Sequence, residues 1–217
     1  MNISKDTELE NCAAQKLGLK RGVVKIAPFC DVWKQYFEEE KELLYKLLGT
    51  DAVDIQHIGS TAVPGLSAKP IIDIMVGVKA LNDGLKHVET LEKQGYEFRG
   101  EAGIPGRLFF AKGSPEFRTH HLHMVEYKSD FWINHLLFRD YLIQHSDTAK
   151  EYERVKMGLA QKYEFDREAY TEGKSEFIQE VLRRARTEKK TYFFPLNLDM
   201  YCATDDDGRS FGRQSSC

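Results

Sequence analysis

The chain has 217 residues, of which 41% are hydrophobic and 12% aromatic, and its 31 basic and 34 acidic side chains give a net charge of −3. This length suits one core of ordinary size. The near balance of charge argues against a dedicated nucleic-acid-binding surface or a polybasic membrane surface. No run approaches the roughly 18 apolar residues that span a bilayer.

The cysteines and the N-terminus favour one compartment. The four cysteines show no CxxC pair and no regular spacing, so we expect neither a disulfide framework nor a zinc site. Cys30, with apolar neighbours, is expected to pack as a small hydrophobe. The first residues are polar and acidic, unlike a signal peptide, and we predict a cytoplasmic protein that makes no membrane contact.

Residues 1–21 show no hydrophobic period and predict a flexible N-terminal arm. Beyond them, β-branched runs predict strands, and apolar residues at helical spacing predict helices. Asp31 and Gly49 are placed to cap the first helix. The elements predicted as far as residue 94 are a strand at 23–26, a helix at 33–48, strands at 53–58 and 71–78, and a helix at 81–94.

Short strands at 96–98 and 108–111 and an alternating strand at 121–127 complete the predicted sheet. The chain then becomes helical, with helices predicted at 130–145, 147–164 and 166–186 and with Asp147 and Asp166 as N-caps of the last two. Residues 187–217 lose all period and predict a disordered tail. The order of elements predicts an α+β protein, with a mixed sheet in residues 22–128 and a helical lobe in residues 129–186.

The stretch HIGSTAVPGLSAKPIIDIMV, residues 57–76, predicts a strand, a phosphate-binding loop and a second strand. Gly59 lets the backbone approach a ligand closely because it has no side chain. Successive N–H groups in such a turn make an anion-binding concavity, and the Ser60 and Thr61 hydroxyls would add donors. Lys69 would bring a positive charge to the same phosphate.

Asp73 lies in a strand that is otherwise apolar. An unpaired buried carboxylate costs several kcal/mol, so we expect Asp73 to bind a cation or to pair with a basic side chain. Mg²⁺ is the cation expected beside phosphates. The alternative is a structural role, in which Lys69 or a later arginine neutralises the acid.

The loop HIGSTAVPGLSAKPIIDIMVGV, together with HHLHMVE, LLFRDYL and YERVKMGLAQKY downstream, resembles the GrpB-like family of the nucleotidyltransferase superfamily over about residues 22–186. A related domain is fused to some bacterial dephospho-coenzyme A kinases. The resemblance implies a nucleotidyltransferase-like fold and a small nucleotide or coenzyme-like substrate. Gly59, Ser60 and Asp73 match the superfamily pattern, but its second acid would fall at Met75. This departure favours nucleotide binding over turnover.

His121 and His123 lie two apart on a predicted strand, so they project from one face, and that strand should lie beside the strand of Asp73. With Asp73 they would form a mixed metal site that replaces the missing acid, or they would act as acid and base. The alternative is a structural role, in which the two histidines are only hydrogen-bonded to their neighbours in the sheet. His57 is a weaker candidate for the same pocket. We expect His120 to be exposed, and His87, His135 and His145 to be packing or helix-surface residues.

A triphosphate needs cations beside it. The predicted phosphate-binding cations are Lys69, Arg107, Lys112 and Arg139, although Arg139 with Asp140 fits an interlobe ion pair somewhat better. The resemblance also covers Lys156 and Lys174, which would bring the helical lobe against the nucleotide. Such helix-surface charges are usually only solvated. Phe109, Phe110 and Phe138 are expected in the core.

These features predict a nucleotidyltransferase that binds a nucleoside triphosphate with Mg²⁺ and transfers a nucleotidyl group to a small acceptor. Asp73 and His123 would be catalytic, and Asp73, His121 and His123 would be the metal ligands, with Mn²⁺ or Zn²⁺ as the alternatives to Mg²⁺. Two other functions stay open. One is a nucleotide- or coenzyme-binding protein without catalysis, and the other is a hydrolase that uses a metal held by histidine and aspartate.

Overall fold

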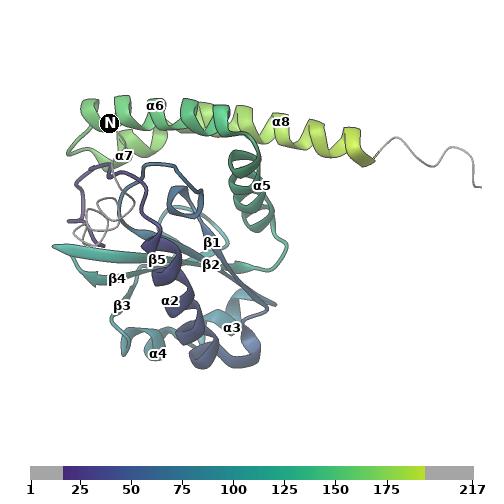
Figure 1. The fold of residues 1–217 in the computed structure, drawn as a ribbon. Helices are drawn as coiled ribbons and strands as arrows, with labels where there is room; N and C mark the ends of the chain where they lie inside the picture. Colours follow the sequence, from purple (N-terminus) through teal and green to yellow (C-terminus); the bar gives the residue numbers. More distant parts are fainter. Residues whose placement is uncertain (1–16, 194–217) are drawn as a thin grey trace, which may run out of the picture.

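A computed structural model describes residues 17–193, so the predictions for residues 1–16 and 194–217 lie outside the described chain. Its centre is a five-stranded sheet with the order β1-β2-β5-β4-β3 (Figure 1). β2 and β5 pair in parallel, and the remaining neighbours pair antiparallel. The strands are β1 (Asp54–Ile58), β2 (Ile72–Val78), β3 (Tyr96–Phe98), β4 (Arg107–Ser114) and β5 (Phe117–Glu126).

One face of the sheet packs on α2 (Val32–Leu48), α3 (Leu81–Leu85) and α4 (Val88–Glu92). Successive side chains of a strand point to opposite faces, so every second residue of β2 enters this core and the residues between them face the other way. The core residues include Trp33, Phe37, Leu44, Ile72, Ile74, Val76, Leu91, Phe110 and Leu122, all at most 4% exposed.

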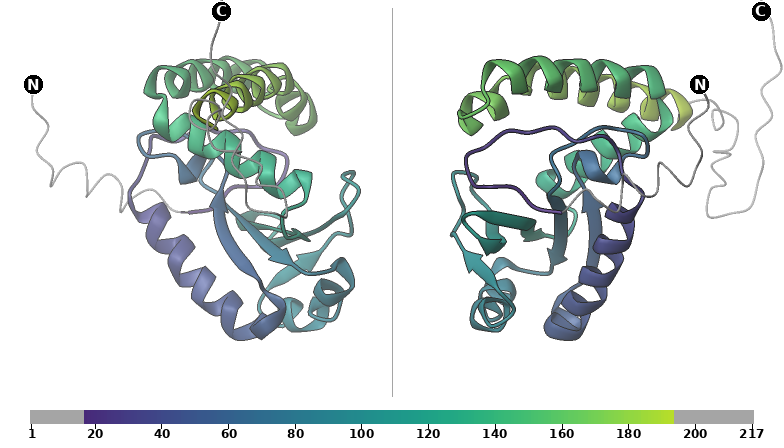
Figure 2. Two further views of the ribbon diagram at one scale, coloured as in Figure 1. Left: turned by 90° about the vertical axis from the view of Figure 1, so that its right-hand side faces the viewer. Right: turned by 60° about the vertical axis from the view of Figure 1, so that its left-hand side comes forward.

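The other face of the sheet is covered by a helical layer (Figure 2) of α6 (Ser146–Lys162), α7 (Arg167–Glu172) and α8 (Ser175–Phe193), which the chain reaches through α5 (Asp130–Gln144). Apolar side chains of α5 and α8 pack together. Lys156 of α6 donates to the Ser67 carbonyl, and Glu153 accepts from the Ser67 amide, which ties the lobe to the loop between β1 and β2. The predicted α+β class with a C-terminal helical lobe is confirmed.

The segment before α2 is bound to the sheet and to the lobe. Leu19 pairs with Arg118 of β5, with N–O distances of 2.9 Å in both directions, and the Val24 amide donates to the Glu164 carbonyl at 2.8 Å. Residues 17–21, predicted as part of a flexible arm, therefore lie against the beginning of β5, the central strand. The predicted strand at 23–26 is wrong, because this stretch bonds to a loop and a helix end and joins no strand.

Several predicted helix boundaries differ from the structure. The helix predicted at 81–94 is two short helices, and the one predicted at 166–186 is α7 and α8, separated at Gly173. Asp166 caps α7 as predicted, since its carboxylate accepts from the Ala169 amide. Asp147 instead lies in the first turn of α6, and Asp31 makes no side-chain cap bond.

Two further expectations concern the cysteines and membranes. Cys30 is 2% exposed and packs in the hydrophobic core, as predicted, but it is also disulfide-bonded, which the spacing of the cysteines did not predict. Within residues 17–193, no helix is both long enough and apolar enough to cross a membrane.

Candidate functional site

A cleft of about 970 Å³ lies between the sheet and the helical lobe. The floor carries those residues of β2, β4 and β5 that point away from the α2 core, and the roof carries residues of α6, α7 and α8. Seven basic side chains face three acidic ones in this cleft, although the whole chain has a net charge of −3. They are Arg21, Lys69, Arg99, Arg107, Lys156, Arg167 and Lys174 against Asp73, Asp166 and Glu168.

β1 enters the cleft through a tight turn at Gly59, which has a φ of +72° that favours glycine. A Cβ at this position would lie 2.8 Å from Asp73 Oδ2, so only glycine lets the turn pack against the carboxylate. Ser60 and Thr61 follow in a short 3-10 helix and line the cleft. The Ser60 side chain is hydrogen-bonded to Tyr152 of the roof.

Asp73 is held by two histidines of the adjacent parallel strand. Asp73 Oδ1 lies 3.1 Å from His121 Nδ1 and 3.6 Å from His123 Nε2. Burial by itself raises the pKa of Asp73, but the hydrogen bonds and charges of the two histidines outweigh it and hold the pKa well below its usual value. Asp73 is therefore a carboxylate at neutral pH, and the predicted meeting of these three side chains is confirmed.

Arg107 distinguishes the two histidines. A guanidinium can only donate, and Arg107 Nη1 lies 3.4 Å from His123 Nδ1, which assigns the His123 proton to Nε2, on the side of Asp73. In His121 it is Nδ1 that donates to Asp73, so Nε2 keeps its lone pair. Burial lowers the pKa of both histidines. His121 thus has the arrangement of a general base that is oriented by a carboxylate.

The donor atoms fit one hard cation better than two cations or a histidine-bound metal. The second acid of the superfamily pattern is replaced by Met75, which is fully buried against Ile58, Val125 and Trp132. His123 Nε2 carries a proton and cannot bind a metal in this arrangement. Among the residues that the structure describes, no three His, Cys, Asp or Glu side chains form a metal site.

Two lysines of the cleft lie at the ring of Tyr170, and a third, Lys156, lies over the ring of Tyr152. Lys69 Nζ lies 5.2 Å and Lys174 Nζ 4.5 Å from the centre of the Tyr170 ring, while Lys156 is 2% exposed. Burial, together with neighbouring cations, lowers the pKa of Lys69 and of Lys174 to about 8 and that of Lys156 to about 7. This arrangement favours an anionic ligand, because a phosphate between these lysines would relieve their mutual repulsion.

Three predicted candidates lie elsewhere. Lys112 points to the opposite face of the sheet, where its Nζ lies 2.6 and 2.7 Å from the Glu40 carboxylate oxygens. Arg139 donates to Gln56 Oε1 and to the His57 carbonyl, each at 2.9 Å, and pairs with Asp140. Neither Lys112 nor Arg139 lines the cleft.

The other histidines and aromatic residues divide between the core and the cleft. His57 faces α2, where its ring stacks on Phe37 at 4.6 Å, so it does not line the cleft. His120, predicted to be exposed, is 8% exposed because it points to the α2 face of β5. His135 does line the cleft, stacked on Phe131 at 3.9 Å. Phe110 is in the core as predicted.

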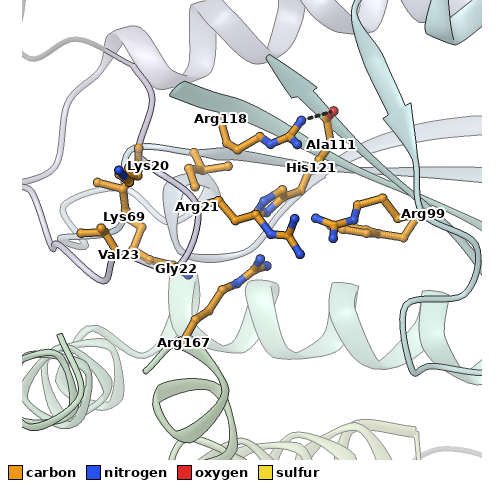
Figure 3. Close-up of a pocket in the computed structure, with 13 residues that line it drawn as sticks. Lys20, Arg21, Gly22, Val23, Lys69, Arg99, Ala111, Arg118, His121 and Arg167 are labelled. Carbon is orange, nitrogen blue, oxygen red and sulfur yellow. Dashed lines mark hydrogen bonds between the residues drawn. The ribbon is translucent and has the colours of Figure 1, made fainter. Parts of the chain in front are cut away.

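Sequence reasoning did not find Arg21, Arg99 and Arg167. All three line the cleft near His121 (Figure 3). They come from the segment before α2, from the residue after β3 and from the start of α7, and nothing in their local sequence distinguishes them from surface arginines. Arg107, which was predicted, lies on the cleft floor, where its guanidinium donates to the carbonyls of Glu101 and Ala102.

The mixed sheet, the Gly59–Ser60 turn and the acid on the next strand define an α+β protein with a basic cleft between its sheet and a helical lobe. The chain belongs to the GrpB family, since the family model described as GrpB protein matches residues 23–184. It is 43% identical over 170 residues to the glutamate-rich protein GrpB of Alkalihalophilus pseudofirmus, which covers 76% of this chain and 98% of that one.

Two further similarities differ in strength. The crystal structure of the conserved protein GrpB from Enterococcus faecalis superposes with a TM-score of 0.71 at 34% identity, over 76% of this chain and 99% of that one. A dephospho-CoA kinase of Mycolicibacterium paratuberculosis is 26% identical over 195 residues, which cover 77% of this chain and 47% of that protein.

Proposed function

We propose that this protein binds a nucleoside triphosphate in the cleft and transfers its nucleotidyl group to a small acceptor. One observation supports the proposal above the others: the Gly59 turn packs on an ionised Asp73 inside a cleft where basic side chains outnumber acidic ones by seven to three. A triphosphate needs this combination, because its charge calls for cations and its reacting phosphate for a fixed carboxylate nearby.

The position of each residue in the cleft indicates its role in the proposed reaction. Ser60 and the backbone of the turn would bind the β- and γ-phosphates, with Lys69 and Lys174 neutralising their charge. Asp73 Oδ2 faces the turn and would hold one Mg²⁺ together with phosphate oxygens, since Mg²⁺ binds through one or two carboxylates plus substrate phosphates. The ion would withdraw charge from the phosphates.

The proton of the acceptor goes to His121 in this scheme. An acceptor oxygen forms a bond to the α-phosphorus, the bond between that phosphorus and the α–β bridging oxygen breaks, and pyrophosphate leaves with the electron pair. The acceptor proton passes to His121 Nε2, and Asp73 stabilises the resulting imidazolium through Nδ1. Between the two histidines the geometry favours His121 as the base, because the Nε2 of His123 is already protonated.

A nucleotide-binding protein without catalysis is the second candidate. The observation that favours it is Met75, which is buried in an apolar cluster at the position where a second metal-binding acid would be expected. Two-metal transfer needs carboxylates that bridge both ions. Both candidates require a bound triphosphate, and they differ in turnover.

Pyrophosphate release separates the two candidates. Wild-type protein is incubated with each of the four common nucleoside triphosphates, Mg²⁺ and a mixture of hydroxyl, amine and phosphate acceptors, with Asp73→Asn as the matched variant. We expect release by the wild type that Asp73→Asn abolishes. If no pyrophosphate appears while nucleotides still bind, the protein is a binding protein. If no nucleotide binds at all, both candidates are wrong.

A further inference from the structure

Three arginines meet at one end of the cleft. Arg21 lies before α2, Arg99 directly follows β3, and Arg167 is the first residue of α7. Figure 3 shows their guanidinium groups pointing toward one another beside His121. We call these three residues the arginine cluster.

The acids that act on the arginine cluster are fewer than its arginines. Asp73 acts on Arg167, and Glu97 acts on Arg21 and Arg99. Arg99 Nε lies 3.7 Å from Glu97 Oε1, but the same carboxylate is bonded by Arg118. Among residues 17–193, neither Arg21 nor Arg167 forms an ion pair within 4.0 Å. Converging like charges destabilise a fold, so the arrangement indicates a site that an anion completes.

Backbone hydrogen bonds fix the three positions independently of one another. The Arg21 amide donates to the Pro115 carbonyl at 2.7 Å, and the Arg99 amide donates to the Phe109 carbonyl at 2.9 Å. Arg167 begins a helix whose N-cap, Asp166, accepts from the Ala169 amide. The arginine cluster is therefore a consequence of the fold, and the site exists before a ligand arrives.

The sheet order separates this cluster from the phosphate turn. Ser60 follows β1 at one edge of the sheet, whereas Arg99 follows β3 at the other edge. Asp73 and His121 lie on β2 and β5, two of the three strands between them. An anion held by the arginine cluster thus lies across the reacting centre from an anion held at Ser60.

We propose that the arginine cluster binds a terminal phosphate of the acceptor, so that the acceptor is a small phosphorylated molecule. This rests on the proposed function, which places the donor triphosphate at Ser60. Guanidinium forks bind phosphate oxygens bidentately, and three forks suit a phosphate dianion better than a neutral acceptor. Such an acceptor would present its reacting group to His121 Nε2, while its own phosphate would bind the arginine cluster on the side of His121 away from the donor triphosphate. The same phosphate chemistry could come from the terminal phosphate of the donor, and a competition experiment distinguishes the two.

The probe is inorganic phosphate, titrated calorimetrically into the full chain alone and with a saturating nonhydrolysable triphosphate and Mg²⁺. We expect phosphate to bind in both conditions. Arg167→Gln and Arg21→Gln should weaken it at least about tenfold, from the loss of charged hydrogen bonds. Arg167→Lys keeps the positive charge but loses the bidentate guanidinium, so its phosphate affinity should lie between those of the wild type and Arg167→Gln. Arg154→Gln, an exposed arginine of α6 outside the cleft, is the matched control and should not change affinity.

Each outcome of the titration either supports or contradicts the proposed acceptor site. If Arg167→Gln and Arg21→Gln bind phosphate as well as Arg154→Gln does, the arginine cluster is not an anion site. If the triphosphate displaces phosphate competitively, the cluster holds the donor and the acceptor assignment is wrong. If no triphosphate binds while arginine-dependent phosphate binding persists, the proposed function fails and the anion site stands without its acceptor role. Unfolding temperatures of all variants show that they fold, and Arg21, on an exposed segment, is the substitution least able to disturb folding.

Discussion

Asp73 and His121 lie opposite each other on parallel strands, with Asp73 Oδ1 3.1 Å from His121 Nδ1. The pairing places the proton of the neutral His121 imidazole on Nδ1, and it leaves a lone pair on Nε2 of this cleft-lining residue. His123, one step along the same face, has its Nδ1 occupied by Arg107 instead. Two histidines of one strand thereby acquire different chemistry from their neighbours alone.

His121→Asn should lower kcat for pyrophosphate release by about 10² to 10⁴, the usual contribution of a general base, and leave triphosphate affinity unchanged. The measurement is steady-state pyrophosphate release, with nucleotide binding determined separately. His145→Gln, at the far end of α5, is the control. Undiminished turnover in His121→Asn would remove the proposed base.

Gly59→Ala should weaken triphosphate binding at least about tenfold, because the new methyl group would lie 2.8 Å from Asp73 Oδ2 and displace the carboxylate or the turn. Gly65→Ala is a matched control, since Gly65 has a similar φ of +77° but no atom within 4 Å of the added Cβ. The positive φ should cost each variant at least about 1 kcal/mol of stability, and Gly59→Ala should lose more because of the contact with Asp73. Equal triphosphate affinity in the two would show that the close approach to Asp73 is unimportant for binding.

Lys112→Ala should destabilise the protein by about 3 kcal/mol, because it leaves the Glu40 carboxylate, 8% exposed, without its cation. Phosphate and triphosphate affinity should be unchanged, since Lys112 lies on the face of the sheet away from the cleft. Urea unfolding and calorimetric titration measure the two quantities. Lys93→Ala, in an exposed pair with Glu89, should change stability by less than about 1 kcal/mol. An intact stability with lost nucleotide binding would return Lys112 to the phosphate site.

Triphosphate binding should take up more protons at about pH 8.5 than at about pH 6.5. Burial lowers the pKa of Lys69 and of Lys174 to about 8 in the free protein. A bound polyphosphate favours the charged amines and raises both pKa values toward 10.5, so protons bind between the two values, and affinity falls as pH rises through this range. Calorimetry in two buffers of different ionisation enthalpy measures the uptake, and Lys174→Met should reduce it. Uptake that is equal in Lys174→Met would assign the protons to other groups.

The arrangement of Asp73, His121 and His123 could be predicted from the sequence, whereas the basic residues around them could be predicted only in part. The alternation of residues 121–127 predicts that His121 and His123 share a face, and strand pairing places that face beside Asp73. The same parity could have excluded Lys112, which shares the face of the core residue Phe110.

The arginine cluster is different, because Arg21, Arg99 and Arg167 meet only through tertiary structure. Arg21 belongs to a segment whose order depends on backbone bonds to β5, and such bonds leave no periodic pattern in the sequence. Arg99 and Arg167 stand at the ends of short elements, where a charged residue is ordinarily solvated.

Calorimetric titration of a nonhydrolysable nucleoside triphosphate with Mg²⁺ tests the central claim most directly. It compares the wild type with Lys174→Met in the cleft and with Lys150→Met on the exposed side of α6. We expect saturable binding of one triphosphate per chain, weakened at least about tenfold by Lys174→Met and unchanged by Lys150→Met. Absence of binding for every nucleoside triphosphate, or equal affinity in the two variants, would contradict a triphosphate site in this cleft.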